Sequence, residues 1–141
     1  TLQQVVALAV LMPVVASMGG IAGSQTLTLI VRGLALGQVT SANIRALMVK
    51  ELKVGGVNGV IWALVIGVVA YFWFTDVLLG VVICLAILFN IVAAALAGVF
   101  VPVILDKLKI DPALSGSVIL TTVTDIVGFV AFLGLGSLFL M

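Results

Sequence analysis

Long apolar runs separated by short polar connections dominate the chain. They cover residues 2–31, 54–74, 77–105 and 112–141 of the 141-residue sequence. Each run is at least as long as the roughly 20 residues that an α-helix needs to cross the hydrocarbon layer. The longer runs predict tilt or extension beyond that layer. The short alternating segments of a membrane β-barrel are absent from the sequence. The pattern therefore predicts an all-α polytopic membrane bundle with four long transmembrane helices.

A polar stretch, "VTSANIRALMVKELKVGG", precedes the second apolar run. Ser41 is the expected helix start, and Ile44, Leu47 and Met48 then share one side of a helix. This helix either lies at the membrane interface or extends the second span.

The basic residues predict the orientation of the spans. They are confined to the connections after the first run (Arg32, Arg45, Lys50, Lys53) and after the third (Lys107, Lys109). The "FTDVL" turn between the second and third runs carries only Asp76. Because loops rich in lysine and arginine remain on the cytoplasmic side of the membrane, we expect both basic connections to be cytoplasmic in a multi-pass integral membrane protein.

Composition excludes several classes of function. The chain is 65% hydrophobic and 8% charged, with a net charge of +1 and no histidine. This is too little positive charge for a nucleic-acid surface, so no nucleic-acid partner is expected. Without histidine, a second carboxylate inside the apolar runs or a phosphate loop, an enzyme is the least favoured reading. The single Cys84 is expected to be a small packing residue, and the opening "TLQQVVALAV" is typical of a fragment that starts within a longer protein.

Small residues recur every fourth position in two of the runs. In the second run they are Gly55, Gly59, Ala63 and Gly67, and in the third Asn90, Ala94, Gly98 and Pro102. Residues four apart share a helix face, and small ones let two backbones approach closely. The second run is therefore expected to pack through this seam, and the Asn90 amide to cross-link helices by a hydrogen bond.

The first run combines Pro13 with a polar and glycine-rich stretch that comprises Gly19, Gly20, Gly23, Ser24, Gln25 and Thr26. Proline removes a backbone donor, so we expect the helix to bend or loosen near mid-depth. Irregular backbone at that depth is tolerated when it is buried in protein or lines a water-filled cavity. Tight packing and pore lining both remain open for this run.

The sharpest signal is Asp125 in "ILTTVTDIVGF", within the fourth run. Ser117, Thr121 and Asp125 are expected to form one stripe, with Gly128 next along it and Thr122 and Thr124 at its flanks. Asp125 lies about 20 Å from Pro112 at about 1.5 Å per residue, inside the hydrocarbon zone. A lone carboxylate there needs a proton, a cation or a base from elsewhere, which makes it a candidate functional site.

Oxygen donors favour a hard cation at Asp125. Magnesium keeps much of its water and binds through one or two carboxylates, so a single aspartate suits a hydrated ion. Two chains paired about an axis along this helix would bring two Asp125 carboxylates to one pathway.

At this point the sequence resembles the MgtE family of magnesium channels and the eukaryotic solute carriers related to them. The resemblance rests on "MPVVASMGGIAGSQTLTLIVRGLALGQV" and "LKIDPALSGSVILTTVTDIVGF", supported by "VKELKVGGVNG" and "FNIVAAALAGVFVPVILDKL". It covers nearly the whole chain, 1–141, as an MgtE-like transmembrane domain with the second to fifth of the family's five helices. It implies a homodimeric magnesium channel in a bacterial inner membrane, with manganese and other divalent cations as further candidates.

The resemblance also implies roles for single residues. Asp125 would bind hydrated magnesium in a pore lined by the first and fourth helices at the dimer interface, and Thr121 would offer an oxygen to the ion. Ser117, Thr122, Gly128, Gly19, Gly20, Gly23, Gln25 and Asn90 would line or support the pore. Asp111 would face the cytosolic magnesium-sensing region, whose sensing and CBS domains are absent from this sequence. Ile21 stands where the family usually has asparagine, so ion preference could differ.

Two other interpretations stay open at the level of sequence. One is a proton- or cation-coupled carrier in which Asp125 titrates. The other is a non-transporting membrane subunit in which Asp125 pairs with a basic residue of another chain.

Overall fold

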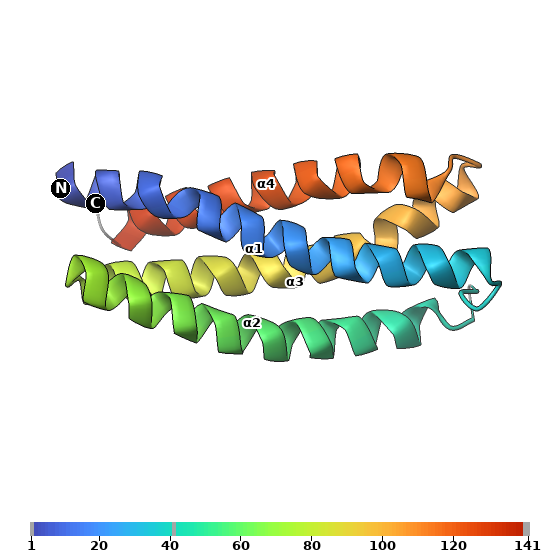
Figure 1. The fold of residues 1–141 in the computed structure, drawn as a ribbon, viewed down its shortest axis with the longest axis horizontal. Helices are drawn as coiled ribbons and strands as arrows, with labels where there is room; N and C mark the ends of the chain where they lie inside the picture. Colours follow the sequence, from blue (N-terminus) through green and yellow to red (C-terminus); the bar gives the residue numbers. More distant parts are fainter. Residues whose placement is uncertain (1, 41, 140–141) are drawn as a thin grey trace.

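The computed structural model describes residues 2–40 and 42–139, and within these ranges every regular element is an α-helix. The helices are α1 (Leu2–Ala35), α2 (Ile44–Phe74), α3 (Val77–Lys107) and α4 (Pro112–Phe139). Together they form an elongated bundle whose helices all run along its long axis (Figure 1). Each is long and apolar enough to cross a membrane, which confirms the predicted all-α membrane bundle.

The helices extend further than the apolar runs. From Ile44 onward, the polar stretch after α1 is part of α2. It therefore extends the second span, which was one of the two expected arrangements. The expected helix start at Ser41 and the final residues 140–141 of the fourth run lie outside the described residues. Charged residues can continue a helix beyond the hydrocarbon because water satisfies their side chains there.

The backbone of α1 corrects one expectation. Helical structure continues from Leu2 to Ala35 through Pro13 and through the glycines that follow it. Of the two expected features, a bend or a loosened backbone, the loosened backbone is therefore not found in α1. Instead, the glycines allow neighbouring side chains to approach the α1 backbone, as described below.

The turns place the helix ends in two groups. A tight turn joins α2 to α3, with Thr75 in the left-handed region (φ 52°). Asp76 then caps α3, because its carboxylate accepts hydrogen bonds from the amides of Leu78 and Leu79 at 3.0 and 3.3 Å. This turn lies at the end of the bundle where α1 begins and α4 ends (Figure 1). The two basic connections lie together at the opposite end, as the predicted orientation requires.

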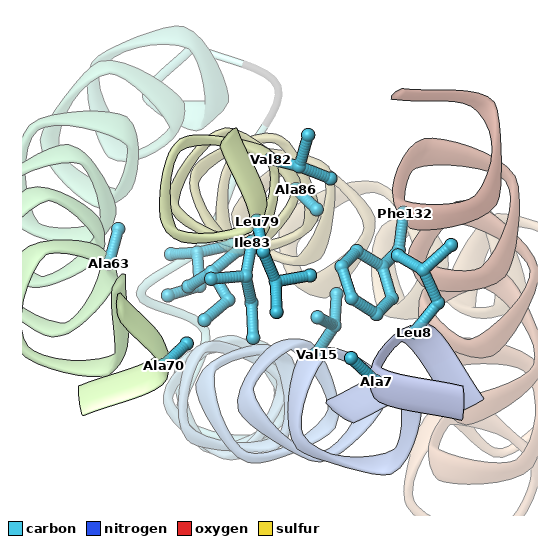
Figure 2. Close-up of a cluster of buried hydrophobic side chains, with 12 residues drawn as sticks. Ala7, Leu8, Val15, Ala63, Ala70, Leu79, Val82, Ile83, Ala86 and Phe132 are labelled. Atoms are coloured by element: carbon cyan, nitrogen blue, oxygen red, sulfur yellow. The ribbon is translucent and has the colours of Figure 1, made fainter. Parts of the chain in front are cut away.

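The core is organised around α3, which packs against α1, α2 and α4. The largest apolar cluster joins side chains from all four helices, including Val15, Ala63, Ile83 and Phe132 (Figure 2). Cys84 packs against this cluster as a partly buried side chain, in agreement with its predicted packing role. The other helices expose most of their apolar residues, which suits a surrounding of lipid.

Small residues bring α2 close to α3. A Cβ built on Gly67 would lie 3.1 Å from the carbonyl oxygen of Gly80, and one built on Gly55 would lie 3.3 Å from the Ala95 side chain. Gly59 and Ala63 are buried in the same interface. These contacts confirm the packing seam predicted from the four-residue spacing.

Candidate functional site

Two neighbouring ridges of α4 have different environments. Every fourth residue of one ridge is buried: Gly116, Leu120, Thr124, Gly128, Phe132 and Gly136. The next ridge contains Thr121, Asp125 and Phe129, and it lines an open groove. The polar residues of α4 are thus divided between the interior of the bundle and its surface.

The groove runs between α1 and α4 and has a volume of about 730 Å³. Besides the three residues of α4, it is lined by one face of α1, which consists of Pro13, Ala16, Ser17, Gly20, Ile21, Ser24, Gln25 and Thr28. The recurrence of these α1 residues every three or four positions is that of a single helix face. The structure therefore brings the polar stretch of α1 to the same groove as Asp125.

Asp125 is the only carboxylate in this groove, and its side chain is half-buried. Across the described part of the chain, no group donates a hydrogen bond to this carboxylate and no basic side chain pairs with it. An ionised carboxylate at this depth requires a counter-charge or water. The open groove gives both of them access.

Side chains with neutral oxygen atoms line the same groove as the carboxylate. Thr121 lies one helical turn before Asp125, and the hydroxyls of Ser17 and Ser24 lie across the groove on α1. Thr28 donates its hydroxyl to the Ser24 carbonyl at 2.8 Å. These groups can accept hydrogen bonds from water or coordinate a hard cation directly.

Several glycines of the expected pore support the contact between α1 and its neighbours and do not line the groove. A Cβ on Gly19 would clash with the Asn90 side chain, and one on Gly23 would lie 3.0 Å from Leu120. Gly128 is on the buried ridge, where a Cβ would lie 3.1 Å from Nδ2 of Asn90. Of the predicted glycines, Gly20 alone lines the groove.

Asn90 is fully buried in the interior of the bundle. Its Nδ2 donates a hydrogen bond to the Val15 carbonyl of α1 at 2.8 Å, whereas its Oδ1 has no partner in the described structure. The expected cross-link between helices is confirmed. Asn90 lies behind the contact of α1 with α4 and has no surface in the groove.

The remaining predicted residues lie away from the groove. Ser117 is exposed two turns before Asp125, and Thr122 is exposed with its hydroxyl donating to the Val118 carbonyl at 2.8 Å. Asp111 is exposed immediately before α4, at the end of the bundle that carries the basic connections.

One buried carboxylate was not predicted from the sequence. Glu51 lies in the second turn of α2, is buried, and accepts a hydrogen bond from the Thr26 hydroxyl of α1 at 3.3 Å. Its position between Lys50 and Lys53 is typical of a polar connection. The available signal was the packing seam, because Glu51 lies four residues before Gly55 and so continues the same face.

The groove can hold a cation that keeps most of its water. No group of three or more histidine, cysteine or acidic residues gathers in the described ranges, so they contain no metal site built from such side chains alone. A magnesium ion with an octahedral shell needs about 180 Å³, taking about 30 Å³ for each of six waters. The groove of about 730 Å³ is large enough for that ion and for further water.

Comparison with known proteins relates the chain to one family. The sequence profile of the MgtE family, described as a divalent cation transporter, matches residues 12–135. The magnesium transporter MgtE of Bacillus subtilis (strain 168) is 32% identical over 139 residues, which is 99% of this chain and 31% of that protein. The transporters of the same name from Enterococcus faecalis and Thermus thermophilus are 34% and 33% identical, over 94% and 99% of this chain and 29% and 31% of their own lengths.

The chain thus spans about a third of the length of these curated relatives. The family profile describes a transporter, in agreement with the prediction that the chain is not an enzyme. With its four membrane-spanning helices, the chain is an integral membrane protein that belongs to the MgtE family of divalent cation transporters.

Proposed function

We propose that the groove between α1 and α4 forms one wall of a pathway for divalent cations, with magnesium as the main substrate. The observation that carries this proposal is Asp125, a half-buried carboxylate in an open groove, without an ion-pair partner in the described residues. The relatives named magnesium transporters support the choice of ion.

Asp125 would bind the ion largely through its waters. Magnesium loses water reluctantly, and one carboxylate with neutral oxygens replaces little of its shell. Water-mediated hydrogen bonds to Thr121, Ser17 and Ser24 would orient the hydrated ion in the groove. Binding through water also lets the ion leave again, which conduction requires.

A second copy of the chain would close the pathway. The groove is open along one side, and an ion between lipid and a single carboxylate would be poorly screened. Two chains facing each other through α1 and α4 would enclose the groove and place two Asp125 carboxylates around one path. The ends that carry the basic connections would face the cytoplasm, with Asp111 directed toward cytosolic regulatory domains.

The test is magnesium uptake by the full-length gene product in liposomes. Replacing the carboxylate, as in Asp125→Ala and Asp125→Asn, is expected to lower uptake at least about tenfold, because a charge-assisted contact contributes about 1.5–3 kcal/mol. Asp106→Asn is the matched control, because Asp106 is exposed in the last turns of α3, away from the groove. Uptake by Asp125→Asn at the level of Asp106→Asn would refute the assignment.

A further inference from the structure

Glu51 is the one buried carboxylate among the described residues. Only 8% of its surface is exposed, and Thr26, its hydrogen-bond donor, is 6% exposed. The Thr26 hydroxyl donates to Oε2 at 3.3 Å, and no described group donates to the other carboxylate oxygen. A single neutral hydrogen bond does not compensate a buried negative charge, so a buried carboxyl group in this arrangement either takes up a proton or is neutralised by a cation.

The basic residues nearest in sequence do not supply that partner. Lys50 and Lys53 flank Glu51 on α2, and both are exposed. In residues 2–40 and 42–139 no basic side chain forms an ion pair with Glu51. A cation that neutralises Glu51 would therefore come from outside the described chain.

Glu51 borders a small pocket of about 90 Å³ between α1, α2 and α3. The polar lining consists of Gln25 and Thr26 from α1 and of Glu51 and Asn58 from α2. Asn58 follows Glu51 by seven residues, so two turns of α2 place both on one face. The pocket thus combines one carboxylate with hydroxyl and amide oxygens, the ligand set of a hard cation.

Size and charge together select the class of cation. At about 30 Å³ per water the pocket has room for about three waters, against the complete octahedral shell that magnesium retains. A divalent ion would also leave one positive charge uncompensated beside a single carboxylate. A monovalent cation that has lost part of its water satisfies both limits.

We propose that this pocket binds a small monovalent cation of the size of sodium, held by the Glu51 carboxylate and by oxygens of Thr26, Asn58 and Gln25. The site is separate from the Asp125 carboxylate, although Gln25 borders both the pocket and the groove. An ion in the pocket joins α2 to α1 one residue away from the wall of the proposed pathway. The inference concerns binding and does not depend on which ion crosses the membrane.

The experiment measures equilibrium binding of radioactive sodium to the purified full-length gene product, with choline replacing sodium at constant ionic strength. Saturable binding is expected for the unchanged protein. Glu51→Gln, which keeps the shape but removes the charge, is expected to weaken sodium binding at least about tenfold. Thr26→Val and Asn58→Leu, which each remove a neutral oxygen, are expected to weaken it by smaller factors.

Controls separate this site from the proposed pathway. Lys53→Gln removes a charge near Glu51 outside the pocket, and Asp125→Asn removes the groove carboxylate; both are expected to bind sodium like the unchanged protein. Absence of saturable sodium binding, or equal binding in Glu51→Gln, would overturn the proposal. If Glu51→Gln does not fold, unchanged affinity in both Thr26→Val and Asn58→Leu would overturn it equally. Competitive displacement of sodium by an equal concentration of magnesium would refute the monovalent assignment.

Discussion

Asp125 and Glu51 are both acidic residues of membrane-spanning helices, but their surroundings differ. Asp125 is half-buried at an open groove of about 730 Å³, whereas Glu51 is buried beside a pocket of about 90 Å³. A carboxylate in a wide groove can keep its own water and meet an ion through that water. A carboxylate in a narrow pocket must exchange much of its water for protein oxygens and an ion. This difference in room leads us to propose a hydrated divalent ion at one and a partly dehydrated monovalent ion at the other.

Ile21 tests the hydrated-ion interpretation at a single residue. It lines the groove with 60% of its surface exposed, so a polar replacement is accommodated without new packing. In Ile21→Asn the amide can bind waters of the ion, and we expect the apparent magnesium affinity to rise about two- to tenfold, as one added hydrogen bond of about 0.5–1.5 kcal/mol implies. The measurement is the concentration dependence of magnesium uptake in liposomes.

The control for this substitution is Ile21→Leu, which changes the shape of the side chain without adding polarity. Its uptake curve is expected to match that of the unchanged protein. An Asn variant with the same or a lower apparent affinity than the Leu variant would contradict a role for water-mediated contacts at this position.

At the scale of the helices, the packing of α1 on α3 depends on Gly98. A Cβ built there would lie 2.7 Å from the Thr26 Cβ and 3.0 Å from the Gly23 carbonyl oxygen. Gly98→Ala is therefore expected to destabilise the protein by about 1–3 kcal/mol, the usual range for overpacking. A thermal melt of the detergent-solubilised protein measures the effect.

Gly56→Ala provides the matched control. Gly56 is also helical, and a Cβ built on it meets nothing within 4 Å. The alanine should leave the melting temperature unchanged or raise it slightly, because alanine favours helix by about 1 kcal/mol. Equal melting temperatures for the two alanine variants would show that the contact of α1 with α3 is looser than the structure indicates.

The helices also show how far the sequence could predict the site. Hydrophobic run length predicted all four spans, and spacing of four residues placed Thr121 and Asp125 together, because both follow from helix geometry alone. Gly128 was expected on that stripe but lies on the neighbouring buried ridge. Which ridge faces inward depends on the helix packed against it, and local spacing contains no information about that partner.

Glu51 was missed for a related reason. Its neighbours Lys50 and Lys53 indicate a solvated connection. The burial of Glu51 becomes apparent only from its contact with Thr26 on another helix. Residues far apart in sequence meet through the packing of α1 and α2 on α3. Pockets between helices are therefore the part of the site that the sequence left undetermined.

At the scale of the whole molecule, the four helices do not enclose a path of their own. The core surrounds α3, and the groove with Asp125 lies on the outside of the bundle between α1 and α4. An ion path through a single copy would have lipid along one side, where a charge is costly. The proposed arrangement of two copies predicts that the α1 faces of two chains approach each other.

Cysteine cross-linking tests this arrangement. In a Cys84→Ala background, Ile21→Cys places one thiol on the exposed face of α1 beside the groove. Val68→Cys places one on α2, at a residue that is 52% exposed and lies at a distance from α1. We expect a short bismaleimide to join two full-length chains through Ile21→Cys in native membranes and to leave Val68→Cys monomeric, because a symmetric interface brings the same residue of both copies together. Cross-linking through Val68→Cys alone would mean that the copies meet through α2, which would leave the Asp125 groove facing lipid and require another chain to close the pathway.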